Sequence, residues 1–382
     1  MEMIEAISDT NIGGAGVLLL TRLENNRKMR EKTLVVLPGG SALAPRLKML
    51  GVAVAELDCC ADRSFELAAV FKYARLIKVE RPAAVNCHGC LSFRIAAFFC
   101  GVPVRIYTRH CTFPPARWQR IRFLRFLVGR AQMLLSNGII AVADAARDDL
   151  IAMGVPSDRV RVIVNGVSGI RRLDNKKRLA VRRELSVPRE AFVVGIFARL
   201  EEYKGHTDLI NAAKILLRKS DKYRFLIVGD GSRKDELIHL CREAGIYEYF
   251  IFTGFASDVT PYMNITDLNV NCSHGTETSS LALSEGMSLG LPSVASDFGG
   301  NCYMVRNGEN GLIYPALDAE KLAYCIERIA NDGELSRTFS QNAYARFKSE
   351  LNAKKMTEET YNYYTFLRSV RASAPSERLQ NN

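Results

Sequence analysis

Two glutamates in the second half of the chain could act on one ligand. Glu277 and Glu285 lie eight residues apart, and the Thr-Ser-Ser that follows Glu277 indicates the start of a helix. On such a helix the two carboxylates differ by roughly 80° around the axis and by about two turns along it. A carboxylate accepts hydrogen bonds from sugar hydroxyls. The spacing fits an elongated sugar-containing ligand, but it also fits acid–base hydrolysis or two solvated surface residues.

The hydroxyl side chains of Thr278, Ser279 and Ser280 suit a helix N-terminus, because they can accept hydrogen bonds from its free backbone N–H groups. That terminus also carries partial positive charge. The segment therefore predicts a diphosphate site beside the glutamates.

Two cations follow an earlier predicted strand. Arg199 offers a planar fork and Lys204 a point charge, a combination that suits a diphosphate leaving group. Gly229, in the sequence VGDG after the next strand, could let the backbone approach a nucleotide closely. A glycine in any strand-to-helix turn would look the same, so this motif by itself is weak.

The first half holds further candidates. Gly14 lies in a glycine-rich turn after the first predicted strand, but the turn lacks the full dinucleotide-binding pattern and fits an ordinary tight turn equally well. His88 and His110 end predicted strands, where they would border a ligand or simply be satisfied structural histidines. Cys87 and Cys90 form a CxxC with no second pair for a metal site; a redox role is the alternative to small apolar residues at a strand end.

Strand-like and helix-like segments alternate in two long series, which predicts the α/β class with two Rossmann-like, doubly wound domains facing a central cleft. A turn at residues 165–167 and a basic stretch at 171–184 mark the boundary. We expect one domain at residues 1–168 and another at 169–355, then a helix at 356–371 and a frayed tail at 372–382. The strands expected in the first series are residues 3–7, 33–37, 52–57, 84–87, 104–107, 139–142 and 161–164.

Composition narrows the class of protein. Of the 382 residues 48% are hydrophobic and 24% charged, as in globular domains. No apolar run reaches the ~18 residues of a membrane span, and the N-terminus lacks the features of a signal peptide, so we expect a cytoplasmic protein. Residues 1–170 carry 23 Lys and Arg against 14 Asp and Glu, whereas the remainder carries 29 against 27. The basic first half favours anionic partners.

These motifs together resemble glycosyltransferase family 4, a family of retaining enzymes with the GT-B fold. The resemblance rests on GGAG after the first strand, R-L-x-x-x-K-G from Arg199, VGDG, the E-x7-E segment and the later Gly299-Gly300, and it runs from about Ile4 to Phe366. The stretch around His110 is similar to bacterial enzymes of exopolysaccharide or capsule assembly.

The resemblance implies a role for each matching residue. Arg199 and Lys204 match the donor-phosphate cations, and Glu277 the residue that holds the transferred sugar. Glu285 matches the residue that binds the ribose. Gly14 matches the glycine that lets the first domain approach the donor phosphate, and His110 matches a histidine near the donor sugar. The residues that match backbone contacts to sugar and phosphate are Thr278, Ser279, Leu281 and Ala282.

Two positions depart from the family pattern. Where the family often has E-G-F-G, this chain has E-T-S-S from Glu277, which leaves the donor sugar open. Tyr303 stands where a Glu is common. The last helix of the fold usually crosses back to the first domain.

The implied reaction is transfer of a sugar from a nucleoside diphosphate, with UDP favoured over GDP, to a glycan or lipid-linked glycan in cell-surface polysaccharide synthesis. The chain contains no D-x-D triplet, so we expect no metal ion and no cofactor, with protein cations in the metal's place. An epimerase or hydrolase on the same scaffold is the first alternative.

The second alternative is a non-catalytic membrane-surface protein. Residues 114–132 form a basic amphipathic pattern in which arginines alternate with aromatic residues. It is typical of a helix on an anionic membrane, which would suit a peripheral enzyme with a lipid-linked acceptor, but also of an ordinary helix packed on a sheet. Nucleic acid is not expected. The residues concerned are Arg117, Trp118, Arg120, Arg122, Phe123, Arg125, Phe126 and Arg130.

Overall fold

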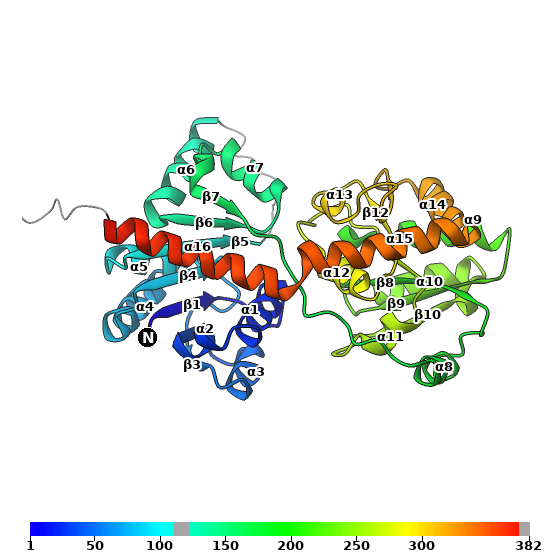
Figure 1. The fold of residues 1–382 in the computed structure, drawn as a ribbon, viewed down its shortest axis with the longest axis horizontal. Coiled ribbons are helices and arrows are strands. Elements are labelled where there is room, and N and C mark those ends of the chain that lie inside the picture. Colours follow the sequence, from blue (N-terminus) through cyan, green and yellow to red (C-terminus); the bar gives the residue numbers. More distant parts are fainter. Residues whose placement is uncertain (111–121, 374–382) are drawn as a thin grey trace, which may run out of the picture. The chain divides into compact units, whose positions relative to one another are not determined.

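The computed structural model describes residues 1–110 and 122–373, which divide into two compact units. The first contains residues 1–166 and the C-terminal helix that begins at residue 353; the second contains residues 167–352. Each unit is built on one parallel β-sheet covered by helices (Figure 1). The predicted class, two Rossmann-like α/β domains, is confirmed.

The first unit has a seven-stranded sheet in the order β3-β2-β1-β4-β5-β6-β7. Its strands are β1 (Met3–Ile7), β2 (Thr33–Pro38), β3 (Ala53–Leu57), β4 (Ala84–His88), β5 (Val104–Arg109), β6 (Gly138–Ala141) and β7 (Val160–Val162). Its helices are α1 (Gly14–Glu24), α2 (Arg27–Lys32), α3 (Leu43–Met49), α4 (Leu67–Glu80), α5 (Leu91–Phe99), α6 (Arg122–Leu135), α7 (Asp144–Ala152), the short η2 (Ser157–Arg159) and α16 (Ala353–Ser373).

Strand β1 is buried on both faces, as expected of a central parallel strand. Its residues alternate between the two sides of the sheet, so that Ile4 and Ala6 pack in one hydrophobic cluster while Met3 and Ile7 pack in the other. Glu5 shares the side of Met3 and Ile7 and is fully buried. A carboxylate in this position needs partners within the sheet.

The second unit has a six-stranded sheet in the order β10-β9-β8-β11-β12-β13. Its strands are β8 (Phe192–Phe197), β9 (Tyr223–Val228), β10 (Phe250–Gly254), β11 (Leu268–Asn271), β12 (Ser293–Ser296) and β13 (Gly311–Tyr314). Its helices are α8 (Asn175–Glu184), η3 (Glu202–Lys204), α9 (His206–Leu217), α10 (Lys234–Glu243), η4 (Tyr247–Tyr249), α11 (Thr260–Ile265), α12 (Leu281–Ser288), α13 (Asn301–Met304), α14 (Ala319–Asn331), α15 (Gly333–Arg346) and the π-helical η5 (Phe347–Leu351).

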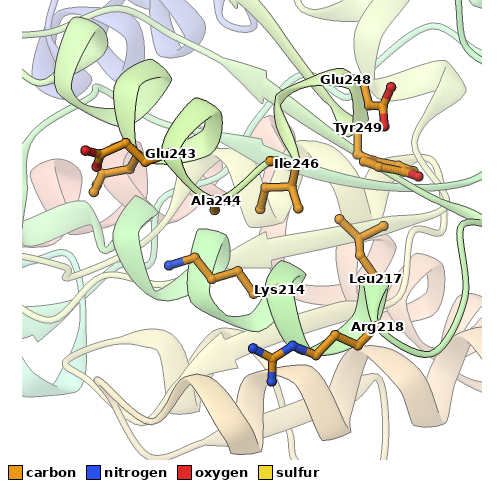
Figure 2. A pocket seen from close by; sticks show the side chains of 10 residues that line it. Lys214, Leu217, Arg218, Glu243, Ala244, Ile246, Glu248 and Tyr249 are labelled. Carbon is orange, nitrogen blue, oxygen red and sulfur yellow. The ribbon is translucent and has the colours of Figure 1, made fainter.

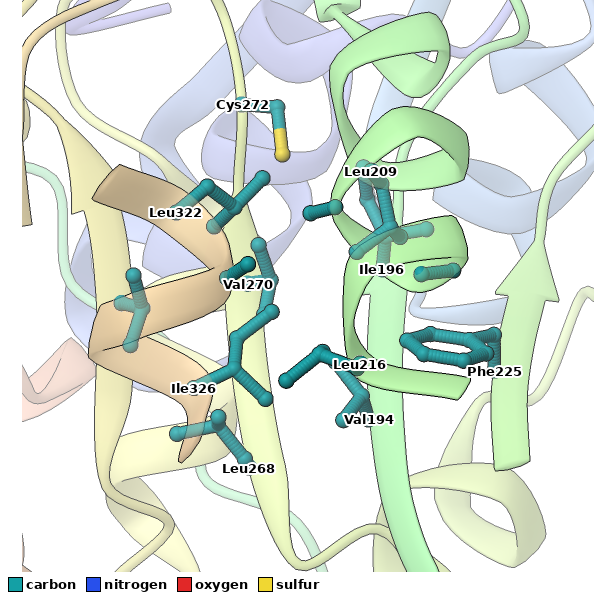
Figure 3. Packing of buried hydrophobic residues seen from close by; sticks show 14 of the residues in the cluster. Val194, Ile196, Leu209, Leu216, Phe225, Leu268, Val270, Cys272, Leu322 and Ile326 are labelled. Atoms are coloured by element: carbon teal, nitrogen blue, oxygen red, sulfur yellow. The ribbon is translucent and has the colours of Figure 1, made fainter. Parts of the chain in front are cut away.

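The core of the second unit lies where two helices cover the middle of its sheet. Figure 3 shows Leu209 and Leu216 of α9 facing Ile326 of α14 above Val194 of β8 and Val270 of β11. All five side chains are almost completely buried. This packing holds the two middle strands in place, and therefore also the loops that leave their carboxyl ends.

Both sheets reverse their strand order at one point, between β1 and β4 in the first unit and between β8 and β11 in the second. Ligands of open α/β sheets bind at the carboxyl ends of the strands beside such a reversal. In the second unit, Arg199 and Lys204 follow β8, and Glu277 follows β11. In the first unit, His88 ends β4. The topology thus places these predicted residues at the edge of each sheet where chemistry is expected.

Helix α4 begins later than the sequence pattern predicts. The pattern of residues 64–79 predicts a helix, but α4 begins at Leu67. Ser64 instead donates its hydroxyl to the carbonyl of Gly89 at 2.6 Å, and the Glu66 carboxylate accepts from the backbone N–H of Cys60 at 2.9 Å. These side chains bind neighbouring loops, which competes with helix formation.

Candidate functional site

Lys204 and Glu277 form an ion pair at the strand reversal of the second unit. Lys204 Nζ lies 2.7 Å from Glu277 Oε2, and the same oxygen accepts from Ser273 Oγ at 2.9 Å and from Asn271 Nδ2 at 3.3 Å. Glu277 is 8% exposed. Its other oxygen, Oε1, has no hydrogen bond to any residue that the structure describes. The pair therefore presents a cation and a free acceptor atom side by side.

Glycine brings the two loops of this pair together. Gly205 has φ +69°, and a Cβ there would lie 2.1 Å from the carbonyl oxygen of Cys272. A Cβ on Gly275 would lie 2.3 Å from Tyr203 Cβ. The backbone N–H of His274 donates to the carbonyl of Tyr203 at 2.9 Å. Only residues without a side chain allow this approach, and it sets the position of Lys204 against Glu277.

The later glycine pair holds the Glu277 loop from the other side. The backbone N–H of Gly300 donates to the Glu277 carbonyl at 3.0 Å. A Cβ on Gly299 would lie 2.0 Å from that same carbonyl oxygen, and one on Gly300 would lie 1.7 Å from the carbonyl oxygen of Thr278. The Gly-Gly motif is therefore explained by backbone packing against the loop that carries Glu277.

Arg199 is exposed and is held within its own loop. Its Nη2 donates to the hydroxyl of Tyr203 at 2.5 Å, and its guanidinium carbon lies 5.9 Å from the centre of the Tyr203 ring. Tyr203 thus positions Arg199 and also contacts Lys204, whose Nζ lies 5.6 Å from the same ring. Sequence reasoning did not single out Tyr203, although it stands inside the R-L-x-x-x-K-G motif.

Gly229 serves the packing of the Arg199 loop. It has φ +150°, and a Cβ on it would lie 2.0 Å from the carbonyl oxygen of Ala198. A Cβ on Gly231 would lie 2.6 Å from that of Leu200. The prediction tied the VGDG glycines to close approach of a nucleotide, whereas the structure explains them by contact with the neighbouring backbone.

Helix α12 begins three residues later than predicted. Ser280 is its N-cap and accepts from the backbone N–H of Leu283 at 3.3 Å, so Thr278 and Ser279 precede the helix. Leu281 and Ala282 form the first turn. Since Glu277 lies outside the helix, the predicted angle of about 80° between the two glutamates does not apply. The Glu277 carbonyl accepts from the backbone N–H of Gly300 and not from a residue one helical turn on.

Asn271 joins the Glu277 loop to the helix start. Its side-chain amide donates to Glu277 Oε2 and, at 3.1 Å, to Ser280 Oγ. Neither Asn271 nor Ser273 was among the predicted site residues. A usable signal existed, because Asn271 ends a strand that is otherwise buried and Ser273 lies two residues beyond it, at a strand reversal.

Glu285 is partly buried in the second turn of α12, and its carboxyl group has no partner among residues 1–110 and 122–373. Burial raises its pKa to about 7. A buried carboxyl without a partner weakens the folded state, so a ligand is a reasonable explanation for its presence.

In the first unit, Gly14 opens α1 and is exposed. A Cβ at this position would meet no atom within 4 Å. Unlike the glycines of the second unit, Gly14 is therefore not required by packing, and the prediction that it lets a ligand approach the helix start stays open.

His110 is part of a buried polar chain at the ends of β4 and β5. His88 Nδ1 lies 2.7 Å from His110 Nε2, and His88 Nε2 lies 2.7 Å from Glu5 Oε2. Arg22 Nη2 donates to Glu5 Oε1 at 3.0 Å. Burial, with the neighbouring His88 and Arg22, lowers the pKa of His110 well below its usual value. Glu5 and Arg22 were missed, although Glu5 is a charged residue inside an apolar strand.

Cys87 and Cys90 are buried free thiols. Burial raises the pKa of the Cys87 thiol well above its usual value and that of Cys90 to about 12, which disfavours the reactive thiolate. Within the described residues no group of three His, Cys, Asp or Glu side chains could hold a metal ion.

The basic amphipathic segment is described only from residue 122, so Arg117, Trp118 and Arg120 lie outside the described residues. On α6, the side chains of Phe123, Phe126, Leu127 and Leu134 are 67%, 47%, 46% and 59% exposed. Arg125 Nη2 pairs with Asp149 of α7 at 2.8 Å. Among the helices of the two described stretches, none has both the length and the apolar character to cross a bilayer.

A surface pocket of about 520 Å³ in the second unit is lined by residues of α9, α10 and η4 and by the turns that follow α9 and α10 (Figure 2). Lys214 of α9 and Arg218, which follows this helix, line it together with Glu243 of α10 and Glu248 of η4. Because it adjoins the carboxyl ends of these helices, it lies at the edge where the parallel strands begin. No predicted site residue lines it.

We predict that Gly300→Ala destabilises the protein by about 1–3 kcal/mol through overpacking against Thr278. Gly300 has φ −81°, which alanine adopts freely, so the cost comes from the close contact alone. Gly333→Ala is the matched control, since a Cβ there meets nothing within 4 Å. Thermal denaturation compares the two, and equal melting temperatures would contradict the packing role.

The raised pKa of Glu285 predicts a pH-dependent stability. Between pH 4.5, its ordinary pKa, and about pH 7, the folded state binds more protons than the unfolded state. The contribution of Glu285 to the free energy of unfolding therefore falls as pH rises through this range and is constant at higher pH. Glu285→Gln should therefore stabilise the protein at pH 8 relative to pH 5, by about 1–3 kcal/mol. The exposed Glu190→Gln serves as control in denaturant unfolding. An equal effect of Glu285→Gln at both pH values would refute the assignment.

Comparison with known proteins identifies both units. Residues 12–168 match the family described as Glycosyltransferase Family 4, and residues 177–346 match Glycosyl transferases group 1. The capsular polysaccharide biosynthesis glycosyltransferase CapM of Staphylococcus aureus is 25% identical over 322 residues, 79% of this chain and 82% of CapM. An Escherichia coli UDP-Gal:alpha-D-GlcNAc-diphosphoundecaprenol alpha-1,3-galactosyltransferase is 23% identical over 78% of this chain and 79% of its own.

Solved structures share the fold. Anabaena HepE in complex with UDP superposes with a TM-score of 0.83 at 21% identity, over 96% of this chain and 100% of HepE. Sucrose-phosphate synthase of Thermosynechococcus elongatus superposes with a TM-score of 0.74 at 17% identity, over 97% and 100% of the two chains. With a family 4 domain in its first half, a group 1 domain in its second and the GT-B fold throughout, the chain belongs to the glycosyltransferases.

Proposed function

We propose that this glycosyltransferase moves a sugar from a nucleoside diphosphate, with UDP favoured over GDP, to a hydroxyl of a glycan or lipid-linked glycan, with retention at the anomeric carbon. The route is cell-surface polysaccharide synthesis, in line with the capsule and lipid-linked glycan enzymes that it is similar to. UDP complexes of a structural neighbour support the choice of base.

The Lys204–Glu277 pair carries this proposal. An ammonium group has three N–H donors, and Lys204 uses one of them on Glu277, so donors remain for a phosphate. Glu277 Oε1 is free to accept a sugar hydroxyl. The first turn of α12, at Leu281 and Ala282, adds backbone donors and partial positive charge beside them. One edge of a sheet thus offers separate contacts for a phosphate and for a sugar.

In the proposed reaction the bond between the anomeric carbon and the diphosphate oxygen breaks as the acceptor oxygen bonds to the same face of that carbon. The acceptor proton passes to an oxygen of the leaving diphosphate. Lys204, Arg199 and the α12 N-terminus stabilise the negative charge that develops on the diphosphate. Glu277 orients the sugar and faces the positive charge at the anomeric carbon, while Glu285 accepts from the ribose hydroxyls.

We propose that the protein cations act in place of a divalent ion. Arg199 and Lys204 supply two positive charges on the loop after β8. In other enzymes a bound metal ion supplies the positive charge that neutralises a diphosphate. Glu277 Oε2 already accepts from three donors in the chain, one of them the Lys204 ammonium, and this cation disfavours a second one beside the same carboxylate.

Lys204→Ala should lower kcat by about 10²–10³-fold, the usual effect of losing one such charge-stabilising donor. Lys219→Ala is the matched control, because Lys219 forms a 2.7 Å pair with Glu327 on the surface of the same unit. Transfer is measured with UDP- and GDP-sugars in the presence of a chelator, where full activity is expected. A strict magnesium requirement would refute metal-free transfer. Sugar release or epimerisation without any acceptor would favour the hydrolase or epimerase alternative.

We also propose that α6 binds an anionic membrane surface, which suits a peripheral enzyme with a lipid-linked acceptor. Four of its apolar side chains are exposed, and the excess of basic residues lies in the same half of the chain. The protein should sediment with phosphatidylglycerol-containing vesicles but not with neutral ones.

Phe123→Glu should reduce this sedimentation, because it places a negative charge on the exposed apolar face. Phe255→Glu, at a residue that is 77% exposed in the second unit, is the control and should bind as the unchanged protein does. Equal recovery with neutral and anionic vesicles would contradict membrane binding.

A further inference from the structure

The carboxylate of Glu5 is a fully buried acceptor in the middle of β1. Burial would raise its pKa, but the charge of Arg22 and the hydrogen bond from His88 outweigh that effect and lower it. Glu5 is therefore ionised. Asn86 Nδ2 also donates to it, at 2.9 Å from Oε2. Every group around this carboxylate is a donor.

An ionised carboxylate can only accept hydrogen bonds, which determines the proton on His88. His88 Nε2 lies 2.7 Å from Glu5 Oε2, so this nitrogen carries the hydrogen. Arg22 Nη2 and Asn86 Nδ2 lie 3.4 Å from the same nitrogen, but each makes a shorter bond to Glu5. These two donors therefore do not change the assignment of the hydrogen to His88 Nε2.

The proton on His88 in turn determines that on His110. A neutral His88 with hydrogen on Nε2 has a lone pair on Nδ1, which lies 2.7 Å from His110 Nε2. His110 must therefore donate from Nε2 and leave its own Nδ1 unprotonated. The charges of Arg22 and Glu5 already balance, so an imidazolium in this chain would add an uncompensated buried charge. Asp9, whose pKa is itself raised by burial and by Asp62, is the other titratable group near His88.

His110 Nδ1 is buried and has no hydrogen-bond partner within residues 1–110 and 122–373. His110 also lines a cavity of about 20 Å³ in the first unit, together with Arg22, His88, Thr108 and Asn165. That volume admits one group the size of a water molecule or a hydroxyl. An unpaired buried nitrogen costs stability unless a ligand satisfies it.

We propose that Glu5 and His88 are positioning residues that hold His110 in the tautomer with an unprotonated Nδ1, so that the first unit presents a neutral acceptor to a ligand hydroxyl. A lone pair at Nδ1 accepts from a hydroxyl and repels the oxygens of a phosphate or carboxylate, so the site selects the sugar part of a ligand. Naming that hydroxyl as part of a sugar rests on the proposed function; the tautomer does not.

The tautomer can be observed directly in the full chain by NMR of ¹⁵N-labelled histidine, because the protein has only five histidines. Individual His→Gln variants assign the signals. In the unchanged protein at neutral pH, His110 Nδ1 should have the chemical shift of an unprotonated nitrogen and Nε2 that of a protonated one. A protonated Nδ1 would overturn the proposal without the need for any variant at Glu5.

Glu5→Gln tests the cause. The glutamine amide can donate to His88 Nε2, which reverses every proton in the chain and leaves His110 with hydrogen on Nδ1. Glu56→Gln is the control, since Glu56 pairs with Lys48 on the surface of the same unit. His88→Gln breaks the chain while keeping the Arg22–Glu5 pair, and it should remove the preference for one tautomer. Unchanged His110 signals in both variants would overturn the proposal.

Binding separates this inference from the proposed function. Glu5→Gln should weaken a UDP-sugar about tenfold, the effect of one misplaced hydrogen bond, and leave the Kd of UDP unchanged. An equal loss for UDP and the UDP-sugar would show a merely structural role and refute the selection of a hydroxyl. If no nucleotide sugar binds the unchanged protein while His110 shows the expected tautomer, the proposed function fails and the positioning role of Glu5 and His88 stands.

Discussion

The buried ion pair between Lys204 and Glu277 is the constraint on which the site of the second unit depends. Taking two charges out of water is costly, and such a pair contributes little net stability. The surrounding backbone nevertheless brings the two loops together, with glycine at four points of close approach: Gly205 and Gly275 between the two loops, and Gly299 and Gly300 against the Glu277 loop. A glycine in these places gives up side-chain packing and costs conformational entropy. That so much local structure serves one ion pair is the physical argument for its functional role.

Both units place candidate residues near a reversal of strand order, but these residues differ in charge. In each sheet the candidate residues lie on or after strands at or next to the reversal of strand order, where loops diverge and leave room for a ligand. The second unit places charges there, on Lys204 and Arg199, which suit phosphate. The first unit balances its one buried carboxylate with Arg22 and ends its polar chain on the neutral His110. In the proposals made above, the charged site takes the diphosphate and the neutral acceptor takes a hydroxyl of the sugar.

Much of the fold was predictable from local pattern. Strands such as β1 and β9 are short apolar runs between turn signals, and their period and spacing predict a parallel sheet with helices on both sides. The predictions failed where a side chain or a loop had a distant partner. Ser64 binds the carbonyl of Gly89, 25 residues away, and lies outside α4, and Gly300 donates to the carbonyl of Glu277 ahead of α12. Neither partner can be read from helix propensity, since both contacts depend on how the chain returns to the same place.

The sequence by itself determined the class of fold, the family and the residue types of the site, because motifs and hydrophobic periodicity are local properties of the chain. Only the tertiary structure decided which of these residues meet. Lys204 and Glu277 are 73 positions apart and meet where parallel strands bring their carboxyl ends to one edge of a sheet. Glu5 and His88 are 83 positions apart and meet because β1 and β4 are neighbouring strands. The tertiary structure also explains Gly229, which was predicted to contact a ligand, by its contact with the neighbouring backbone. Proton positions along Glu5, His88 and His110 follow from distances, which no sequence pattern contains.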